Sequence, residues 1–155
     1  MGKVKIGKKI PEFSLPATGE QTISLSALKG RRLVLYFYPK DSTPGCTIEG
    51  RDFRDNIKKF KALNTVIFGV SRDSLKSHEN FKEKECFPFE LLSDADEKLC
   101  KMFDVIKEKN MYGKKVMGIE RSTFLIDENG ILRNEWRKLK VEGHVAEVLD
   151  AIKKL

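Results

Sequence analysis

The 155-residue sequence contains only three cysteines, and no two of them form a C-x-x-C pair. Such an odd, scattered set argues against the disulfide framework of a small secreted domain. The two histidines are equally scattered, so the close ligand pairs of a zinc site are missing and we expect no metal. Neither a G-x-S-x-G element nor a glycine-rich phosphate loop is present. A single cysteine is therefore the first candidate for a catalytic residue.

Long apolar runs are also missing, and none could cross a membrane. Residues 1–9 are basic but contain no apolar segment and no cleavage site, unlike a secretory signal peptide. The sequence has no repeat, low-complexity segment or linker. We therefore expect one cytoplasmic domain, residues 1–155, without a membrane partner. A chain of this length can bury roughly two-thirds of its surface without disulfide support.

The formal net charge is +7, and the cations are scattered in small clusters. Most of them fit the solvated faces of helices. A basic surface can bind nucleic acid without specificity. No recognition motif or aromatic-interleaved basic patch accompanies this charge, so we expect no specific nucleic-acid partner.

Hydrophobic periodicity predicts an α/β fold with a mixed sheet. The predicted strands are 13–15, 22–25, 32–38, 65–70, 89–92, 122–126 and 131–136. The predicted helices run from Cys46 to about Leu63, from Ser74 to before Pro88, around 99–103 with Asp94 as N-cap, and over 144–155. Segment 107–118 is polar and lysine-rich, which predicts a flexible stretch. The strand-helix-strand unit over 32–70 requires a parallel pair with a right-handed crossover.

Cys46 stands where the apolar strand 32–38 gives way to a helical pattern. Pro39 stops the strand because proline has no N–H to donate, and Thr43 offers a hydroxyl near the thiol. A helix N-terminus or a nearby cation lowers the pKa of a cysteine from about 8.5 and so favours the reactive thiolate. The alternative is a buried structural cysteine. The polar neighbours of Cys46 place it in a turn and favour a nucleophile.

The run from Pro39 to Cys46, Pro-Lys-Asp-Ser-Thr-Pro-Gly-Cys, resembles the peroxiredoxin motif P-x-x-x-T-x-x-C. With Tyr38 before it and Thr47 and Glu49 after it, the stretch is similar to the PrxQ type, also called bacterioferritin comigratory protein. Further stretches agree in the expected order along nearly the whole chain, including S-R-D-S-L-K-S-H from Ser71 and G-I-E-R-S-T-F-L-I-D from Gly118.

This resemblance implies a thioredoxin-like fold of the peroxiredoxin type, with a mixed central sheet flanked by helices and an added N-terminal hairpin. It also implies a peroxidase for hydrogen peroxide and small organic hydroperoxides that acts in antioxidant defence and redox homeostasis. The Cys46 thiolate would become a sulfenic acid, and a thioredoxin-like or other thiol reductant would complete the cycle. No cofactor is implied, and relatives are monomers or weak homodimers.

The resemblance also assigns roles to four neighbours of Cys46. Arg121, in the E-R-S-T-F stretch, would approach the thiolate and polarise the peroxide oxygens, since a guanidinium stays charged and offers several donors. Thr43 would hydrogen-bond the same oxygens, and Pro39 would shield the site from water. Glu49 would support the site by orienting Arg121 or an arginine of the helix.

The resolving cysteine departs from the family pattern. Relatives carry it either on the Cys46 helix, where Arg51 stands here, or on the next helix, where Lys82 stands here. Cys86 lies one turn beyond Lys82 and is the first candidate. Cys100 comes second, because packing beside Leu99 and Phe103 is the better explanation for it. Otherwise an external thiol would resolve Cys46.

Two rival functions remain at this point. One is a thioredoxin-type disulfide oxidoreductase, against which the missing C-x-x-C pair argues. The other is a non-catalytic basic binding or chaperone-like protein, in which Cys46 would be dispensable. Loss of peroxide reduction on removal of Cys46 separates both rivals from a peroxidase.

Overall fold

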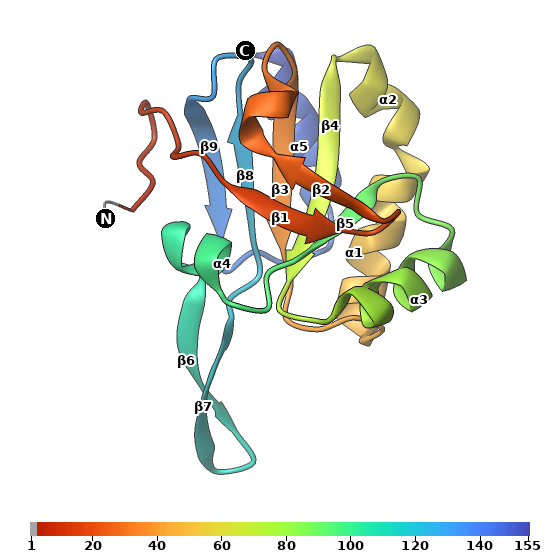
Figure 1. The fold of residues 1–155 in the computed structure, drawn as a ribbon, viewed down its shortest axis with the longest axis vertical. Helices are drawn as coiled ribbons and strands as arrows, with labels where there is room; N and C mark the ends of the chain where they lie inside the picture. Colours follow the sequence, from red (N-terminus) through yellow and green to blue (C-terminus); the bar gives the residue numbers. More distant parts are fainter. Residues whose placement is uncertain (1–2) are drawn as a thin grey trace.

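The computed structural model, which describes residues 3–155, is built around a seven-stranded mixed sheet with strand order β2-β1-β5-β4-β3-β8-β9 (Figure 1). These strands are β1 (Ser14–Ala17), β2 (Gln21–Ser24), β3 (Arg32–Phe37), β4 (Thr65–Ser71), β5 (Glu90–Ser93), β8 (Ser122–Ile126) and β9 (Leu132–Arg137). A separate hairpin of β6 (Ile106–Met111) and β7 (Lys114–Ile119) projects from one end of the body (Figure 1).

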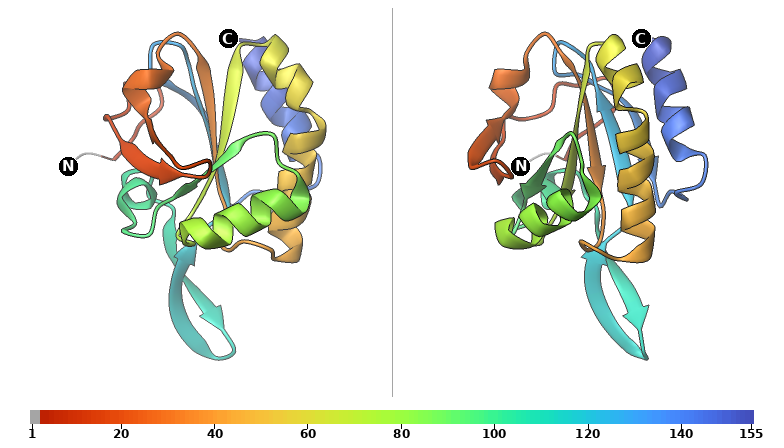
Figure 2. Two further views of the ribbon diagram at one scale, coloured as in Figure 1. Left: turned by 45° about the vertical axis from the view of Figure 1, so that its right-hand side comes forward. Right: turned by 90° about the vertical axis from the view of Figure 1, so that its right-hand side faces the viewer.

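Helices cover the sheet on both sides. They are the 3-10 helix η1 (Leu25–Leu28) and the α-helices α1 (Pro44–Asp55), α2 (Ile57–Ala62), α3 (Leu75–Glu85), α4 (Lys98–Met102) and α5 (His144–Lys153). Figure 2 shows α1, α2 and α5 on one side of the central strands β3, β4 and β8, and it shows η1 and the bent-over β1–β2 edge of the sheet on the other side. Within residues 3–155, none of the helices has the length and apolar character needed to span a bilayer.

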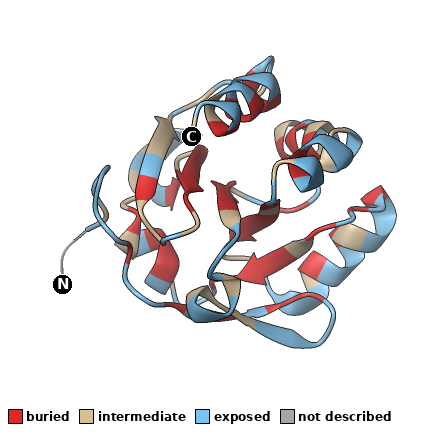
Figure 3. Cartoon of the chain, turned by 90° about the horizontal axis from the view of Figure 1, so that it is seen from above, coloured by how far each residue is buried: buried red, intermediate tan, exposed pale blue. Residues whose placement is uncertain are grey.

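Strand β3 is buried on both faces, so alternate side chains enter two separate cores. Leu33, Leu35 and Phe37 point into the core beneath the N-terminal hairpin and α4. Val34 and Tyr36 point into the core beneath α1, α2 and α5. The buried inner faces and exposed outer faces of the elements are seen from above in Figure 3. A strand buried on both sides reads as one apolar run, which explains the sequence of this segment.

The predicted mixed sheet and N-terminal hairpin are confirmed. Strand β3 pairs in parallel with β4 and antiparallel with β8, and β1 pairs antiparallel with β2. The predicted hairpin over 122–136 is also present as β8 and β9. The β3–β8 register pairs Phe37 with Ser122. This register brings Arg121 beside the end of β3, from which the chain continues toward Cys46.

The single predicted helix from Cys46 to Leu63 is wrong in two respects. It begins two residues earlier, at Pro44, because proline is well suited to the first helical position. It is also interrupted at Asn56, which separates α1 from α2. The Asn56 side chain donates a 2.8 Å hydrogen bond to the Asp52 carbonyl oxygen. Short polar side chains of this kind compete with the helical hydrogen-bond ladder.

Residues 107–118, for which the sequence predicts a flexible stretch and no strand, form most of the β6–β7 hairpin. Tyr112 and Gly113 both have positive φ at the tip, as a tight hairpin turn requires. The Asp94 prediction also needs correction, because Glu97 occupies the N-cap position of α4. Asp94 still serves that helix, since its carboxylate accepts hydrogen bonds from the Leu99 and Cys100 N–H groups.

Candidate active site

Cys46 is the third residue of α1, directly after the loop that leaves β3. Its side chain is almost fully buried, with 1% exposure, in the core that contains Tyr36, Tyr38 and Phe53. The expectation that Cys46 lies in a polar turn and away from apolar surroundings is therefore wrong. The first turn of a helix presents unpaired N–H groups and the positive end of the helix dipole. Cys46 combines that position with an apolar environment.

Arg121 contacts the sulfur directly. Its Nη2 lies 3.3 Å from Cys46 Sγ, and its Nη1 donates a 2.7 Å hydrogen bond to Glu49 Oε1. Burial disfavours the guanidinium charge, but Glu49 and Cys46 more than compensate and raise the pKa of Arg121. The planar fork of an arginine suits two simultaneous contacts of this kind. The arrangement can hold negative charge on sulfur and on an oxygen bound beside it.

Glu49 lies one helical turn after Cys46, and its side chain is only 1% exposed. Burial raises the pKa of this carboxyl to about 7, although Arg121 opposes the rise. One oxygen, Oε1, accepts from Arg121, whereas Oε2 has no hydrogen-bond partner among residues 3–155. Ionisation of Glu49 is therefore unfavourable, and the carboxyl group changes from neutral to charged near neutral pH.

Replacing Glu49 by glutamine should make stability less dependent on pH. The folded pKa of about 7 lies above the ordinary 4.5, so Glu49 favours the folded state most below pH 4.5. That contribution is lost as the pH rises through 7. We expect the free energy of unfolding of Glu49→Gln, minus that of wild type, to increase by roughly 2 kcal/mol between pH 5 and pH 8.

Guanidinium denaturation at the two pH values measures this difference. Glu147→Gln, on the exposed surface of α5, is the matched control and should show a difference that hardly changes with pH. A Glu49→Gln difference as flat as that of the control would contradict the raised pKa of Glu49.

The other two predicted neighbours lie on the loop between β3 and α1. Pro39 is half-buried just after β3, and Thr43 occupies the N-cap position of α1. The Thr43 hydroxyl donates a 2.9 Å hydrogen bond to the Lys40 carbonyl oxygen. The Thr43 carbonyl oxygen in turn accepts from the Thr47 hydroxyl at 2.8 Å. The structure therefore brings Cys46, Arg121 and Glu49 into contact, and it places Thr43 on the turn that leads to them.

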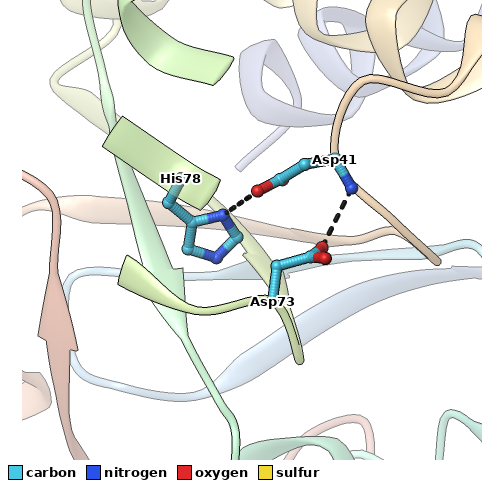
Figure 4. Close-up of side chains that lie close together, drawn as sticks. All are labelled: Asp41, Asp73 and His78. Carbon is cyan, nitrogen blue, oxygen red and sulfur yellow. Dashed lines mark hydrogen bonds and ion pairs between the residues drawn. The ribbon is translucent and has the colours of Figure 1, made fainter. Parts of the chain in front are cut away.

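A buried polar network, to which the sequence reasoning gave no role, anchors this loop. Asp41 accepts hydrogen bonds from the Tyr38 hydroxyl at 2.6 Å and the Ser77 hydroxyl at 2.8 Å. His78 Nδ1 lies 2.7 Å from Asp41 Oδ2, and the Asp41 N–H donates to Asp73 Oδ2 (Figure 4). The network thus connects the Cys46 loop to α3.

The ligand atoms of Asp41, Asp73 and His78 lie within 4.8 Å of one another, a spacing that a metal site would also show. Each residue is nevertheless engaged by protein groups, because Asp73 accepts from the Ser71 hydroxyl and His78 Nε2 donates to the Leu92 carbonyl oxygen. Such internally satisfied groups are the usual state of buried polar side chains. We interpret the cluster as a structural connection between the loop and α3.

The remaining two cysteines differ sharply in their surroundings, although both are free thiols. Cys100 is fully buried in α4, and burial together with nearby Asp94 raises the pKa of its thiol strongly. Cys86 is exposed and ends α3 with a left-handed backbone, φ +56°. Glycine or asparagine usually occupies such a position. Seven other non-glycine residues among residues 3–155 also have positive φ, so the feature that separates Cys86 from Cys100 is its exposure.

The end of α3 is docked onto α1 close to Cys46. Arg51 Nε donates a 2.6 Å hydrogen bond to Glu85 Oε1, and Arg54 Nη1 donates to the Glu85 carbonyl oxygen at 2.8 Å. The Phe87 ring lies so close against Gly50 that a Cβ added at this glycine would collide with the ring. Gly50 is one turn after Cys46, so the segment that carries Cys86 rests on the same helix as Cys46.

Known proteins share this sequence and fold. The family model described as the AhpC/TSA family matches residues 6–135. Peroxiredoxin Bcp of Xanthomonas campestris is 58% identical over 91% of this chain and 89% of its own length. Peroxiredoxin Bcp of Bacillus subtilis is 54% identical over 97% of this chain and 96% of its own length.

Solved structures agree. Xanthomonas campestris Peroxiredoxin Q superposes with a TM-score of 0.88 at 56% identity, over 92% of this chain and 90% of that one. A cysteine-to-serine mutant of Xylella fastidiosa PrxQ gives a TM-score of 0.93 at 46% identity, over 99% and 98% of the two chains. These structures confirm the predicted thioredoxin-like fold of the peroxiredoxin type. The chain belongs to the AhpC/TSA family and is an enzyme of that family, a peroxiredoxin of the Bcp or PrxQ type.

Proposed function

We propose that Cys46 is the peroxidatic nucleophile of this thiol-dependent peroxidase, and that Arg121 stabilises the charge that develops during the reaction. The observation that carries the proposal is the contact of Arg121 Nη2 with Cys46 Sγ at 3.3 Å, with Glu49 bound to the other end of the same guanidinium. A cation held beside a cysteine sulfur is a common feature of reactive cysteines in proteins. Peroxide reduction needs the thiolate form of that sulfur.

In the proposed first step, the Cys46 thiolate attacks one peroxide oxygen while the O–O bond breaks. The sulfur is oxidised to sulfenic acid, and the leaving oxygen takes a proton and departs as water or alcohol. Arg121 faces the oxygens on which negative charge accumulates. Thr43 lies on the turn leading into α1. Because its hydroxyl donates to the Lys40 carbonyl oxygen, its oxygen would accept a hydrogen bond from the bound peroxide, and Pro39 would restrict access of water from the loop side.

We propose that hydrogen peroxide and small organic hydroperoxides are the substrates. Support comes from a relative, since the bacterioferritin comigratory protein of Xanthomonas campestris has alkyl peroxide reduction activity. That protein's structure aligns with this chain at 55% identity and a TM-score of 0.88. No step of the proposed reaction requires a metal or an organic cofactor, and the physiological setting is antioxidant defence.

Cys86 is our proposed resolving cysteine. Its thiol would attack the Cys46 sulfenic acid, releasing water and forming a disulfide that a thioredoxin-like dithiol then reduces by exchange. Two variants of Xanthomonas campestris Peroxiredoxin Q replace cysteines 36 positions apart. The residue 36 positions after Cys46 is Lys82, so Cys86 is one helical turn further along. Its exposure supports a role beyond packing.

This disulfide requires a change of conformation, because Cys46 is buried in α1 whereas Cys86 is exposed at the end of α3. We infer that the first turn of α1 and the end of α3 open locally before the two sulfurs meet. We also propose that residues 1–155 act as one domain, as a monomer or weak homodimer.

Mass spectrometry after one equivalent of hydrogen peroxide, with a sulfenic-acid trap present, tests the assignment of both cysteines. We expect a Cys46–Cys86 disulfide in wild type, and a trap adduct on Cys46 in Cys86→Ser. A trap adduct on Cys46 of wild type with Cys86 still free would show that an external thiol, and not Cys86, resolves the Cys46 sulfenic acid. An unmodified Cys46 in both proteins would overturn the proposed nucleophile.

A further inference from the structure

Lys109, on strand β6 of the projecting hairpin, directs its ammonium group toward the base of that hairpin. Its Nζ donates a hydrogen bond to the carbonyl oxygen of Ile119, the last residue of β7. The aliphatic chain lies across Gly118, where an added Cβ would be 3.3 Å from Lys109 Cδ and 3.5 Å from Cε. Glycine at 118 therefore leaves the space through which this lysine passes.

The carbonyl that Lys109 binds stands two residues before Arg121. Ile119 is fully buried, and the Glu120 N–H donates to the Val105 carbonyl oxygen at 2.7 Å. The hairpin continues directly into β8 through this segment (Figure 1). Arg72 makes a second connection at the base, since its Nη2 donates to the Met117 carbonyl oxygen at 3.3 Å. Lys109 thus fixes the backbone that delivers Arg121 to Cys46.

Lys109 also lies in the electrostatic field of the site. Burial and the charge of Arg121 lower its pKa, whereas Cys46 and Glu120 oppose the change. Arg72 adds a further, smaller repulsion. An ammonium group tolerates repulsion from two arginines when it gains a compensating charged hydrogen bond, which the Ile119 carbonyl provides here.

We propose that Lys109 is a positioning residue for peroxide reduction, which holds the Ile119–Arg121 segment in place and so keeps Arg121 beside Cys46. This inference rests on the proposed role of Cys46 and Arg121. It gives the hairpin a part in the reaction, because strand β6 supplies the lysine and β7 supplies the carbonyl that receives it.

The experiment compares Lys109→Met with Lys115→Met. Both changes remove one positive charge from the same hairpin, but the Lys115 side chain is 83% exposed and pairs only with Glu108 among residues 3–155. We expect Lys109→Met to slow the oxidation of Cys46 by hydrogen peroxide about tenfold in stopped-flow measurements, an effect of the size expected for one charged hydrogen bond. Lys115→Met should stay within about twofold of wild type, as expected for an exposed charge.

Alkylation of Cys46 by iodoacetamide provides a readout that needs no peroxide. The pH profile of alkylation should move to higher pH in Lys109→Met and remain in place in Lys115→Met. Lys109→Arg, which keeps the charge and can still donate to Ile119, should recover most of the oxidation rate. Thermal denaturation of each variant establishes that the fold is retained.

Equal rates and equal alkylation profiles in Lys109→Met and Lys115→Met would overturn the proposal. A slow Lys109→Met with an unmoved alkylation profile and no recovery in Lys109→Arg would reduce Lys109 to a fold-stabilising residue, and would also overturn it. A wrong assignment of Cys46 as the peroxidatic nucleophile gives a different result, because peroxide would then not oxidise Cys46 even in wild type.

Discussion

Cys46→Ser should lower the rate of peroxide consumption by about a thousandfold or more, which is the scale of effect seen when a covalent nucleophile is removed. A serine hydroxyl does not ionise near neutral pH and cannot accept an oxygen to become a sulfenic acid. Serine has the same side-chain shape as cysteine and is only slightly smaller, so the fold should be retained. Stopped-flow peroxide assays with a thiol reductant measure the rate, and circular dichroism follows the fold.

Cys100→Ala is the control for Cys46→Ser, because Cys100 is also buried but lies in α4, away from Arg121. This variant should keep its activity within about twofold of wild type, provided that it folds. Undiminished peroxide reduction in Cys46→Ser would remove Cys46 from the mechanism. If wild type reduces no peroxide but exchanges disulfides, the thioredoxin-type oxidoreductase is revived. If wild type reduces no peroxide and Cys46→Ser retains any binding or chaperone-like activity that wild type shows, the non-catalytic binding protein is favoured.

Arg121→Ala should slow the oxidation of Cys46 by about a hundredfold, comparable to the loss of one preorganised donor at a developing charge. The variant loses the contact with Cys46 Sγ and at the same time leaves Glu49 buried without its counter-charge. The rate is read from the stopped-flow oxidation of Cys46 in a single turnover. Stability should also fall at pH 8, because a buried carboxylate without a partner is strongly disfavoured.

The double variant Arg121→Met with Glu49→Gln separates these two effects. Removing both charges should restore stability at pH 8, because no buried carboxylate remains, whereas the oxidation rate should stay low. Arg133→Ala, which removes an exposed arginine paired with the buried Asp127, is the control for loss of an arginine and should retain the wild-type rate. A wild-type oxidation rate in Arg121→Ala would contradict the proposed role.

Local pattern was sufficient to predict the unit that carries Cys46. An apolar run that ends at Pro39, followed by helical spacing, requires a strand, a turn and a helix in that order, and β3 and α1 have this form. Local pattern misjudged the surroundings of Cys46, because the core that contains it also includes side chains from distant parts of the chain, such as Phe87 and Leu125. Burial of a residue depends on contacts that its immediate neighbours in the sequence do not reveal.

Contacts between distant residues explain the other differences. Arg121 and Cys46 are 75 positions apart, so only the family resemblance could suggest their proximity. The β6–β7 hairpin carries polar residues on both faces and therefore lacks the alternation by which strands are found in sequence. The hydrogen bond from Lys109 to the Ile119 carbonyl oxygen and the Asp41–His78 contact are also invisible in the sequence pattern. Their partners are brought together only when the chain has folded.

The contact between the Phe87 ring and Gly50 links the segment that carries Cys86 to the helix that carries Cys46. Local opening of that helix is therefore expected to release both cysteines of the proposed disulfide together. Because the ring occupies the space above Gly50, unwinding of α1 around Cys46 removes the surface on which Phe87 and its neighbour Cys86 rest. Under resolution by Cys86, a sulfenic acid that becomes exposed therefore meets a partner released at the same moment. If Cys86 resolves Cys46 as proposed, such concerted release would shorten the interval in which a second peroxide can over-oxidise Cys46, and the small residue at position 50 would then protect the enzyme from its own substrate.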